Sequence, residues 1–205
     1  VVRTYLMFLG PWEQGGDWSA RGISGISRWL NRIWKLVLEE YRMPLEAVAE
    51  DKLGGEKAHR DLQRTTHQTI RKVTEDLERL CFNTMIAALM EFTNYLTKVR
   101  EKGCGTGSAW KEAIDTLLLL LAPTAPHLTE ELWQRTGRDY SIHNQSWPHW
   151  DEELARDEEI TMVVQVNGKL RDRMIVPASI TEAEARQLAV ERQRVQAYLA
   201  GRQVT

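Results

Sequence analysis

The chain has little cysteine and no long hydrophobic run, and each absence excludes a class of protein. Its 205 residues include two cysteines, Cys81 and Cys104, neither in a Cys-x-x-Cys or Cys-x-x-His pattern. A disulfide-stapled fold and a zinc site are therefore not expected, and two free thiols are typical of the cytoplasm. Apolar runs such as Leu117 to Ala122 are far shorter than the ~20 residues that span a bilayer, so no membrane partner is expected.

Motifs that carry catalysis are also missing. The five histidines lack the spacing of metal ligands, and no pair of acids lies beside a candidate nucleophile. The glycine-rich stretch EQGGDW, residues 13–18, lacks the Lys-Ser/Thr of a phosphate-binding loop. The sequence therefore offers no catalytic residue, no metal site and no cofactor site. A net charge of -2 gives no overall attraction to nucleic acid, and DNA is not an expected partner, although local basic patches remain possible.

What is present is helical periodicity over the first three quarters of the chain. Apolar residues recur at helical spacing in five segments, and the first helix is expected to end near Met43-Pro44 because the residue before proline avoids helical geometry. The second segment has Ala58, Leu62, Thr66, Thr69, Val73 and Leu77 on one face. The fourth ends in LLLLLAP, where five consecutive leucines predict burial on nearly every side. An antiparallel helical bundle is predicted.

The period changes after residue 159. ITMVVQV and KLRDRMIVP alternate as strands do, and Asn167-Gly168 between them predicts a hairpin with a type I′ turn. Thr181 with Glu184 forms a capping-box pattern that opens a helix to about Ala200. The acidic stretch at 151–159 is interpreted as a linker, so a small α+β piece is expected to follow the bundle.

Cations recur at helical and strand spacing in three places. On the first helix they stand at i, i+4 and i+7, opposite the apolar stripe: Arg28, Arg32 and Lys35. The second helix has basic residues at the same spacing, continued to i+11: Arg60, Arg64, His67 and Arg71. The hairpin has alternating Lys169, Arg171 and Arg173. Like charges at this spacing destabilise an isolated helix, which favours a polyphosphate partner. The alternative is that each strip is simply a solvated face. Trp29 and Trp34 are interpreted as core residues rather than base-stacking platforms.

Four phrases carry a family resemblance as well. RWLNRIWKLV, FNTMIAALMEFTNYL, LLLLLAPTAPHLTEELW and SWPHWDEEL occur in order. Together they resemble the helical tRNA-binding region of class I aminoacyl-tRNA synthetases for leucine, isoleucine and valine. TYLMFLGPWEQGGDW and VVQVNGKLRDRMIVP are similar to the leucine-specific members of the bacterial type. The family's two ATP-binding signatures, HIGH and KMSKS, are absent from these 205 residues, and Val1 in place of a methionine suggests a piece of a longer protein.

The resemblance implies a domain plan. Residues 1–20 would be a connector from a catalytic domain outside this chain, 21–150 an anticodon-binding-type helical bundle, and 160–205 part of a C-terminal α+β domain. Leucine–tRNA ligase activity, ATP and magnesium would belong to the intact enzyme, with no cofactor in this fragment. The expected partner is leucine-specific tRNA, bound by a monomer.

In this family the leucine enzymes are described as gripping the tRNA body and corner without reading the anticodon. The cations of the two helices are accordingly assigned to the tRNA body and those of the hairpin to its corner. Two alternatives stay open: the anticodon-reading bundle of an isoleucyl- or valyl-tRNA synthetase, and a structural interaction module that binds no RNA.

Overall fold

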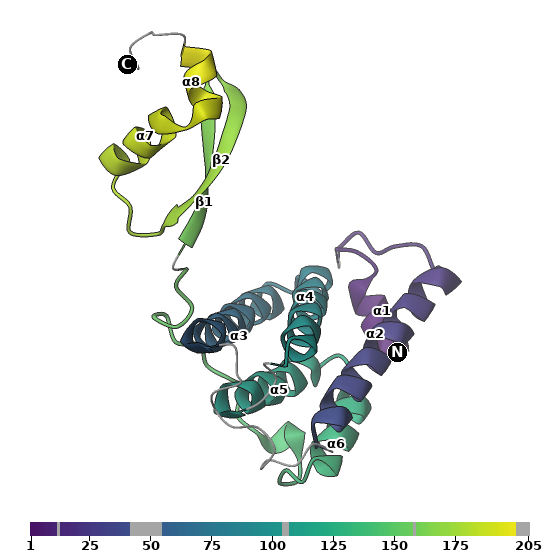
Figure 1. Ribbon diagram of the computed structural model, residues 1–205. Helices are drawn as coiled ribbons and strands as arrows, with labels where there is room; N and C mark the ends of the chain where they lie inside the picture. Colours follow the sequence, from purple (N-terminus) through teal and green to yellow (C-terminus); the bar gives the residue numbers. More distant parts are fainter. Residues whose placement is uncertain (12, 42–54, 104–106, 158, 200–205) are drawn as a thin grey trace. The chain divides into compact units, whose positions relative to one another are not determined.

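The computed structural model describes residues 1–11, 13–41, 55–103, 107–157 and 159–199. Contacts divide the chain into two compact units, Val1–Ala155 and Arg156–Thr205. The first unit is built of helices, and the second combines a two-stranded antiparallel sheet with two helices (Figure 1). The predicted fold class, mainly helical with a small α+β piece at the end, is confirmed.

The first unit is a bundle in which α3 packs on α4 and α5, and α2 packs on α1, α4 and α6. Its elements are α1 (Val2–Phe8), α2 (Ala20–Tyr41), α3 (Gly55–Glu78), α4 (Phe82–Glu101), α5 (Gly107–Leu121), α6 (Pro126–Arg135) and the short 3-10 helix η3 (Ile142–Asn144). The predicted end of the first helix at Met43-Pro44 lies outside the described residues.

Helix α5 lies at the centre of this bundle, as its run of leucines predicts. Leu117, Leu118, Leu120 and Leu121 are fully buried, and Leu119 is partly buried. Each large buried side chain contributes roughly 1.5–3 kcal/mol to the free energy of unfolding. The stripe predicted for the second helix also faces this core, with Leu62, Thr66, Thr69 and Val73 buried.

The N-terminal residues belong to the bundle as well. Tyr5 of α1 is buried in the core, and its hydroxyl accepts a hydrogen bond of 2.7 Å from the backbone N–H of Ser19, just before α2. Gly22 lets the two helices approach, since a Cβ there would come within 2.7 Å of Tyr5 Cε2. The start of α2 is therefore fixed against α1.

A segment after η3, residues 147–155, is bound along α3 by several hydrogen bonds, and we call it the strap. Trp147 Nε1 donates to Thr74 Oγ1 at 2.8 Å, the backbone N–H of Asp151 donates to His67 Nδ1 at 3.0 Å, and Gln68 Nε2 donates to the carbonyl of Ala155 at 2.9 Å. The first half of the acidic stretch interpreted as a linker, up to Ala155, is thus packed on the bundle.

The second unit consists of β1 (Glu159–Val166), β2 (Lys169–Pro177), α7 (Glu182–Glu191) and α8 (Gln193–Leu199). Asn167 and Gly168 both have positive φ, 54° and 73°, which confirms the predicted hairpin turn. The Thr181–Glu184 capping box is also present. One helix was predicted as far as Ala200, but the structure ends α7 at Glu191 because Arg192 adopts extended geometry (ψ 123°).

The strand register contains a bulge that the alternating sequence does not reveal. Val164 pairs with Asp172 and Gln165 with Leu170, so Arg171 has no partner across the ladder. A bulge inserts one extra residue and changes which face later side chains point to. Val164, Met174 and Val176 face α7 and α8 and form a small core with Ala185 and Val195.

Candidate nucleic-acid interface

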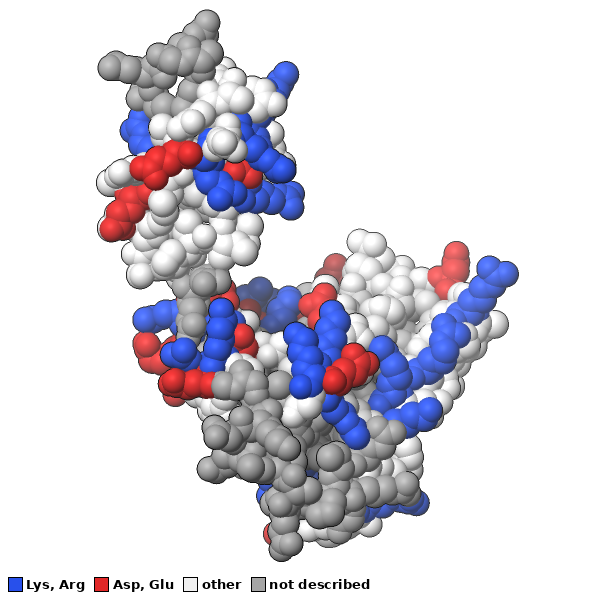
Figure 2. Space-filling model, viewed as in Figure 1, with Lys and Arg blue, Asp and Glu red and all other residues white. Residues whose placement is uncertain are grey.

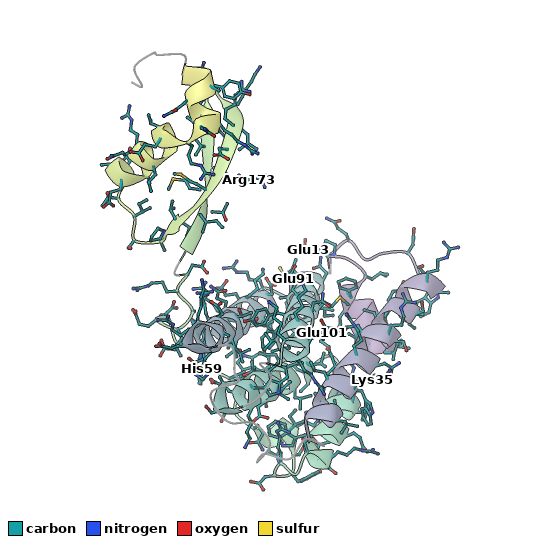
Figure 3. The ribbon with its side chains drawn as sticks, viewed as in Figure 1. Glu13, Lys35, His59, Glu91, Glu101 and Arg173 are labelled. Carbon is teal, nitrogen blue, oxygen red and sulfur yellow. The ribbon has the colours of Figure 1, made fainter. Side chains whose placement is uncertain are left out.

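Helix α2 separates its side chains cleanly by chemistry. Its inner face buries Ile26, Trp29, Leu30, Ile33, Leu36 and Val37. On the outer face stand three exposed cations, Arg28, Arg32 and Lys35, which we call the α2 ridge. Figure 2 shows Lys and Arg following one another along this helix, and in Figure 3 Lys35 points away from the bundle. The burial of the inner face fixes the direction in which the ridge points.

The α2 ridge keeps its positive charge. Among the described residues, no carboxylate forms an ion pair with any of its three cations. Arg32 is held instead by a neutral acceptor, since its Nη1 donates to Asn94 Oδ1 of α4 at 2.9 Å. A ridge of exposed cations attracts a polyanion more strongly when carboxylates do not pair with it, as is the case among the described residues.

The strip predicted on α3 is different. Arg60 is exposed but has an interaction within the protein. Arg64 forms an ion pair with Asp61, one turn earlier, at 2.5 Å, and Arg71 lies 3.5 Å from Glu152 of the strap. Basic and acidic side chains are accordingly interleaved over α3 in Figure 2. The positive charge of this strip is largely compensated within the protein, unlike that of the α2 ridge.

The expectation that His67 faces outward with these arginines is wrong. Its side chain is buried, with a relative exposure of 6%. Its Nδ1 accepts from the Asp151 backbone, which fixes the proton on Nε2, and Nε2 lies 3.5 Å from Glu112 Oε1 of α5. The imidazole therefore joins α3, α5 and the strap, and it is unavailable to a partner.

The three cations predicted to share one face of the hairpin do not share it. Arg173 pairs with Val163 and Lys169 with Val166. Val163 and Val166 are three residues apart on β1, so they point to opposite faces. Arg171 is the bulged residue, and its guanidinium stacks on the Tyr198 ring at 3.8 Å from the ring centroid. Of the three, Lys169 and Arg173 are exposed, on different faces.

The same spacing argument could have found one further cation. Arg21 stands seven residues before Arg28, two helical turns away on the same face of α2, and it is exposed. The interpretation of the tryptophans needs one change. Trp29 is fully buried and donates from Nε1 to Thr93 Oγ1 at 3.1 Å. Trp34 is only partly buried and carries the Arg135 guanidinium over its ring, at 5.2 Å.

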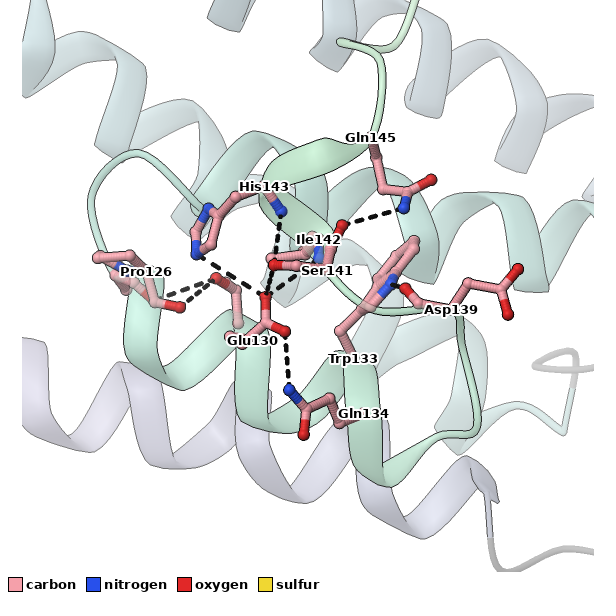
Figure 4. A network of polar contacts seen from close by, with 11 residues as sticks. Pro126, Glu130, Trp133, Gln134, Asp139, Ser141, Ile142, His143 and Gln145 are labelled. Atoms are coloured by element: carbon pink, nitrogen blue, oxygen red, sulfur yellow. Dashed lines mark hydrogen bonds and ion pairs between the residues drawn. The ribbon is translucent and has the colours of Figure 1, made fainter.

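A second polar cluster, formed by α6 and the segment that follows it, has a structural role (Figure 4). Glu130 of α6 accepts hydrogen bonds from Ser141 Oγ at 2.5 Å and from the Ile142 backbone at 3.1 Å. Gln134 donates to its other oxygen at 2.8 Å. These bonds, with that of Ser141 the strongest, hold the pKa of Glu130 below its usual value. The carboxylate is committed to anchoring η3 on α6, and His143 Nε2 lies 3.8 Å from the same carboxylate.

In the part of the chain that the structure describes, no group of three or more His, Cys, Asp or Glu side chains is placed to hold a metal ion. No helix in it is both long and apolar enough to cross a membrane.

A helical bundle with an uncompensated ridge of cations is the kind of surface that helical nucleic-acid-binding domains present. A family model described as the anticodon-binding domain of tRNA ligase matches residues 59–186. The chain belongs to this family.

Its relatives narrow the class further. The chain is 55% identical over 202 residues to the leucine–tRNA ligase of Dehalococcoides mccartyi strain BAV1, covering 98% of this chain and 24% of that protein. It is 49% identical over 204 residues to the leucine–tRNA ligase of Rubrobacter xylanophilus, covering 100% and 24%. The chain thus spans about a quarter of the length of these relatives.

A solved structure is similar over the whole chain. It is the crystal structure of a ternary complex, agnB2 LeuRS-tRNA-LeuAMS of Agrobacterium radiobacter K84. The match has a TM-score of 0.81 and 32% identity, and it covers 100% of this chain and 27% of that one. The predicted resemblance to the leucine enzymes is confirmed.

Proposed function

We propose that this chain contributes the tRNA-holding surface of a leucine–tRNA ligase, with the α2 ridge against phosphates of the tRNA body. The observation that carries this proposal is the exposure of Arg28, Arg32 and Lys35 without carboxylate partners among the described residues. Phosphate contacts from arginine and lysine position a nucleic acid without reading its bases. Folded RNA is recognised largely through its shape and backbone.

The described residues contribute binding and orientation rather than bond-making. The ligase attaches leucine to its tRNA using ATP, and ATP and magnesium are held by a part of the enzyme outside this chain. The partner is leucine-specific tRNA, bound in the cytoplasm by one copy of the protein. Relatives named leucine–tRNA ligase and a neighbour solved with tRNA support this assignment.

Not all predicted cations have the same weight in this proposal. The α2 ridge comes first, and Arg21 extends it by two helical turns. Arg64 and Arg71 of α3 contribute less because their ion pairs within the protein compete with a phosphate, and Arg60 also has an interaction within the protein. Lys169 and Arg173 remain candidates for a contact at the tRNA corner, where the opposite faces that they occupy allow only one of them to touch a given surface.

The test is a salt titration of binding between the chain and a transcript of leucine-specific tRNA. Each substitution Arg28→Ala, Arg32→Ala and Lys35→Ala should weaken binding and lower the slope of log K against log salt by about one. Arg64→Ala is the matched control: it removes the same charge from a neighbouring helix, but from a side chain already paired with Asp61. Its slope should change less than that of any ridge variant.

Tryptophan fluorescence during urea unfolding checks that each variant is folded. Equal slopes for the wild type and all three ridge variants would refute the contact, as would a loss for Arg64→Ala as large as that for Arg32→Ala. Swapping the anticodon bases of the transcript should leave affinity unchanged. A large loss on swapping would instead favour the anticodon-reading alternative.

A further inference from the structure

Arg32 differs from its neighbours on the α2 ridge because another helix holds it. Its Nη1 donates to Asn94 Oδ1 across the gap between α2 and α4, and the two residues are 62 positions apart in sequence. Both side chains are exposed. A long arginine side chain at the surface normally samples many rotamers, so a contact that fixes it reduces the entropy that is lost when a phosphate binds.

The acceptor is neutral, which preserves the charge of the arginine. Elsewhere in the chain Arg64, Arg138 and Arg192 are held by the carboxylates of Asp61, Asp115 and Asp172. Those pairs neutralise the guanidinium. An amide oxygen orients it without doing so, and it occupies one of the five N–H donors of the group. The other donors have no partner among the residues that the structure describes, and they can form the paired hydrogen bonds that arginine makes with phosphate.

The buried core sets the position of Asn94. Trp29, three residues before Arg32, donates to Thr93, the residue next to Asn94. Trp29 and Thr93 are buried, with exposures of 2% and 0%. Two of the hydrogen bonds that join the two helices therefore lie at the same level, one inside and one at the surface. The inner bond fixes the register of α2 on α4, and this places the Asn94 amide beside Arg32.

We infer that Asn94 is a positioning residue for RNA binding: it presents the charged guanidinium of Arg32 in an orientation ready for a phosphate. This inference rests on the proposed function, and it adds a residue that no helical spacing of cations would select. The neighbours of Asn94 on the exposed side of α4 include Glu91 and Glu101 (Figure 3). These residues carry charge, whereas Asn94 has a neutral amide.

The experiment uses the same tRNA salt titration on the full chain with Asn94→Ala and Asn94→Asp. Asn94→Ala should weaken binding roughly three- to ten-fold while the salt slope stays near the wild-type value, since Arg32 is still charged. Asn94→Asp should weaken it further and lower the slope by about one, because the new carboxylate neutralises Arg32. Asn144→Ala, an exposed asparagine of η3, is the matched control and should bind like the wild type.

The double variant Arg32→Ala/Asn94→Ala decides between positioning and direct contact. If Asn94 acts through Arg32, the double variant binds as Arg32→Ala does. Additive losses mean that Asn94 touches the RNA itself and overturn the inference, as does wild-type affinity for Asn94→Ala. A wild-type chain without affinity for the transcript overturns the proposed function together with this inference, whereas a silent Asn94→Ala beside a weakened Arg32→Ala overturns this inference alone.

Discussion

The C-terminal helical segment is interrupted at Arg192, and the side chain of this residue forms an ion pair with Asp172. Its Nε donates to Asp172 Oδ2 at 2.8 Å, and its backbone is extended between α7 and α8. The Asp172 carboxylate is buried on β2, and a second oxygen of the same group accepts from the Arg173 backbone at 2.9 Å. The pair therefore fixes the bend between two helices to a strand of the sheet.

Asp172→Asn should destabilise the second unit at neutral pH. It should also reduce the loss of unfolding free energy that occurs as the pH falls. The hydrogen bond from Arg192, the largest cause, lowers the pKa of Asp172 in the folded state. A carboxyl with a lowered folded pKa stabilises the fold above its unfolded pKa of about 4, and this contribution is lost as pH falls through the folded value. Urea unfolding followed by NMR of the Met162 and Met174 methyls at pH 7 and pH 3 measures it. Equal acid sensitivity in the variant and the wild type would contradict this role.

Thr181→Ala should destabilise α7 by about 1 kcal/mol, since it removes the side chain that accepts from the Glu184 backbone. The hydrogen bond from the Thr181 backbone N–H to Glu184, with that from the Thr181 hydroxyl, lowers the pKa of Glu184. The contribution of this carboxylate is therefore present at neutral pH and lost in acid. Hydrogen exchange of the first-turn amides of α7 measures the change, with Ser179→Ala outside the helix as control. Unchanged exchange would show that the cap contributes nothing.

Trp29→Ala should lower the free energy of unfolding of the bundle by roughly 3–5 kcal/mol, because it leaves a cavity beside Thr93. Trp34→Ala should cost less, roughly 1–2 kcal/mol, because that ring is partly exposed and its further contact is with the Arg135 guanidinium. Urea unfolding followed by far-UV circular dichroism compares the two variants. The ranking fails if Trp34→Ala is the more damaging.

His67→Leu should loosen the strap while α2 keeps its exposed cations. The change removes the acceptor of the Asp151 N–H, and the loss of one part-buried hydrogen bond costs about 1 kcal/mol. Faster hydrogen exchange at Asp151, with tRNA affinity close to that of the wild type, is the expected result. A loss of affinity as large as that of Arg32→Ala would restore His67 to the interface.

Helical spacing predicted the buried faces well because packing in a bundle follows the same period. It located Leu62 and Val73 in the core and Arg28 and Arg32 at the surface. It could not identify partners that come from far along the chain. Asp151 and Glu112 reach His67 from 84 and 45 positions away (151 − 67 and 112 − 67), so its burial depends on tertiary contacts that one helix does not encode.

The remaining differences have local causes that the sequence pattern hides. The strand alternation of KLRDR is regular, yet pairing skips Arg171. The helix predicted from Thr181 onward contains neither glycine nor proline before Ala200, yet it breaks at Arg192, whose backbone is extended and whose side chain forms an ion pair with Asp172. Asn94 is neutral, so the spacing of cations in the sequence does not indicate it, and only the structure shows that it lies beside Arg32.

Because Arg171 has no partner across the ladder, the alternation of β2 side chains between the two faces of the sheet shifts by one residue. A regular ladder of the same composition would gather its lysine and arginines into one electropositive stripe. Here the charge is divided, with Lys169 on one side, Arg173 on the other and Arg171 stacked on Tyr198. The sheet can therefore meet an approaching molecule with only a single strand cation per side. Any strong hold by this unit must draw on several elements together rather than on β2 alone.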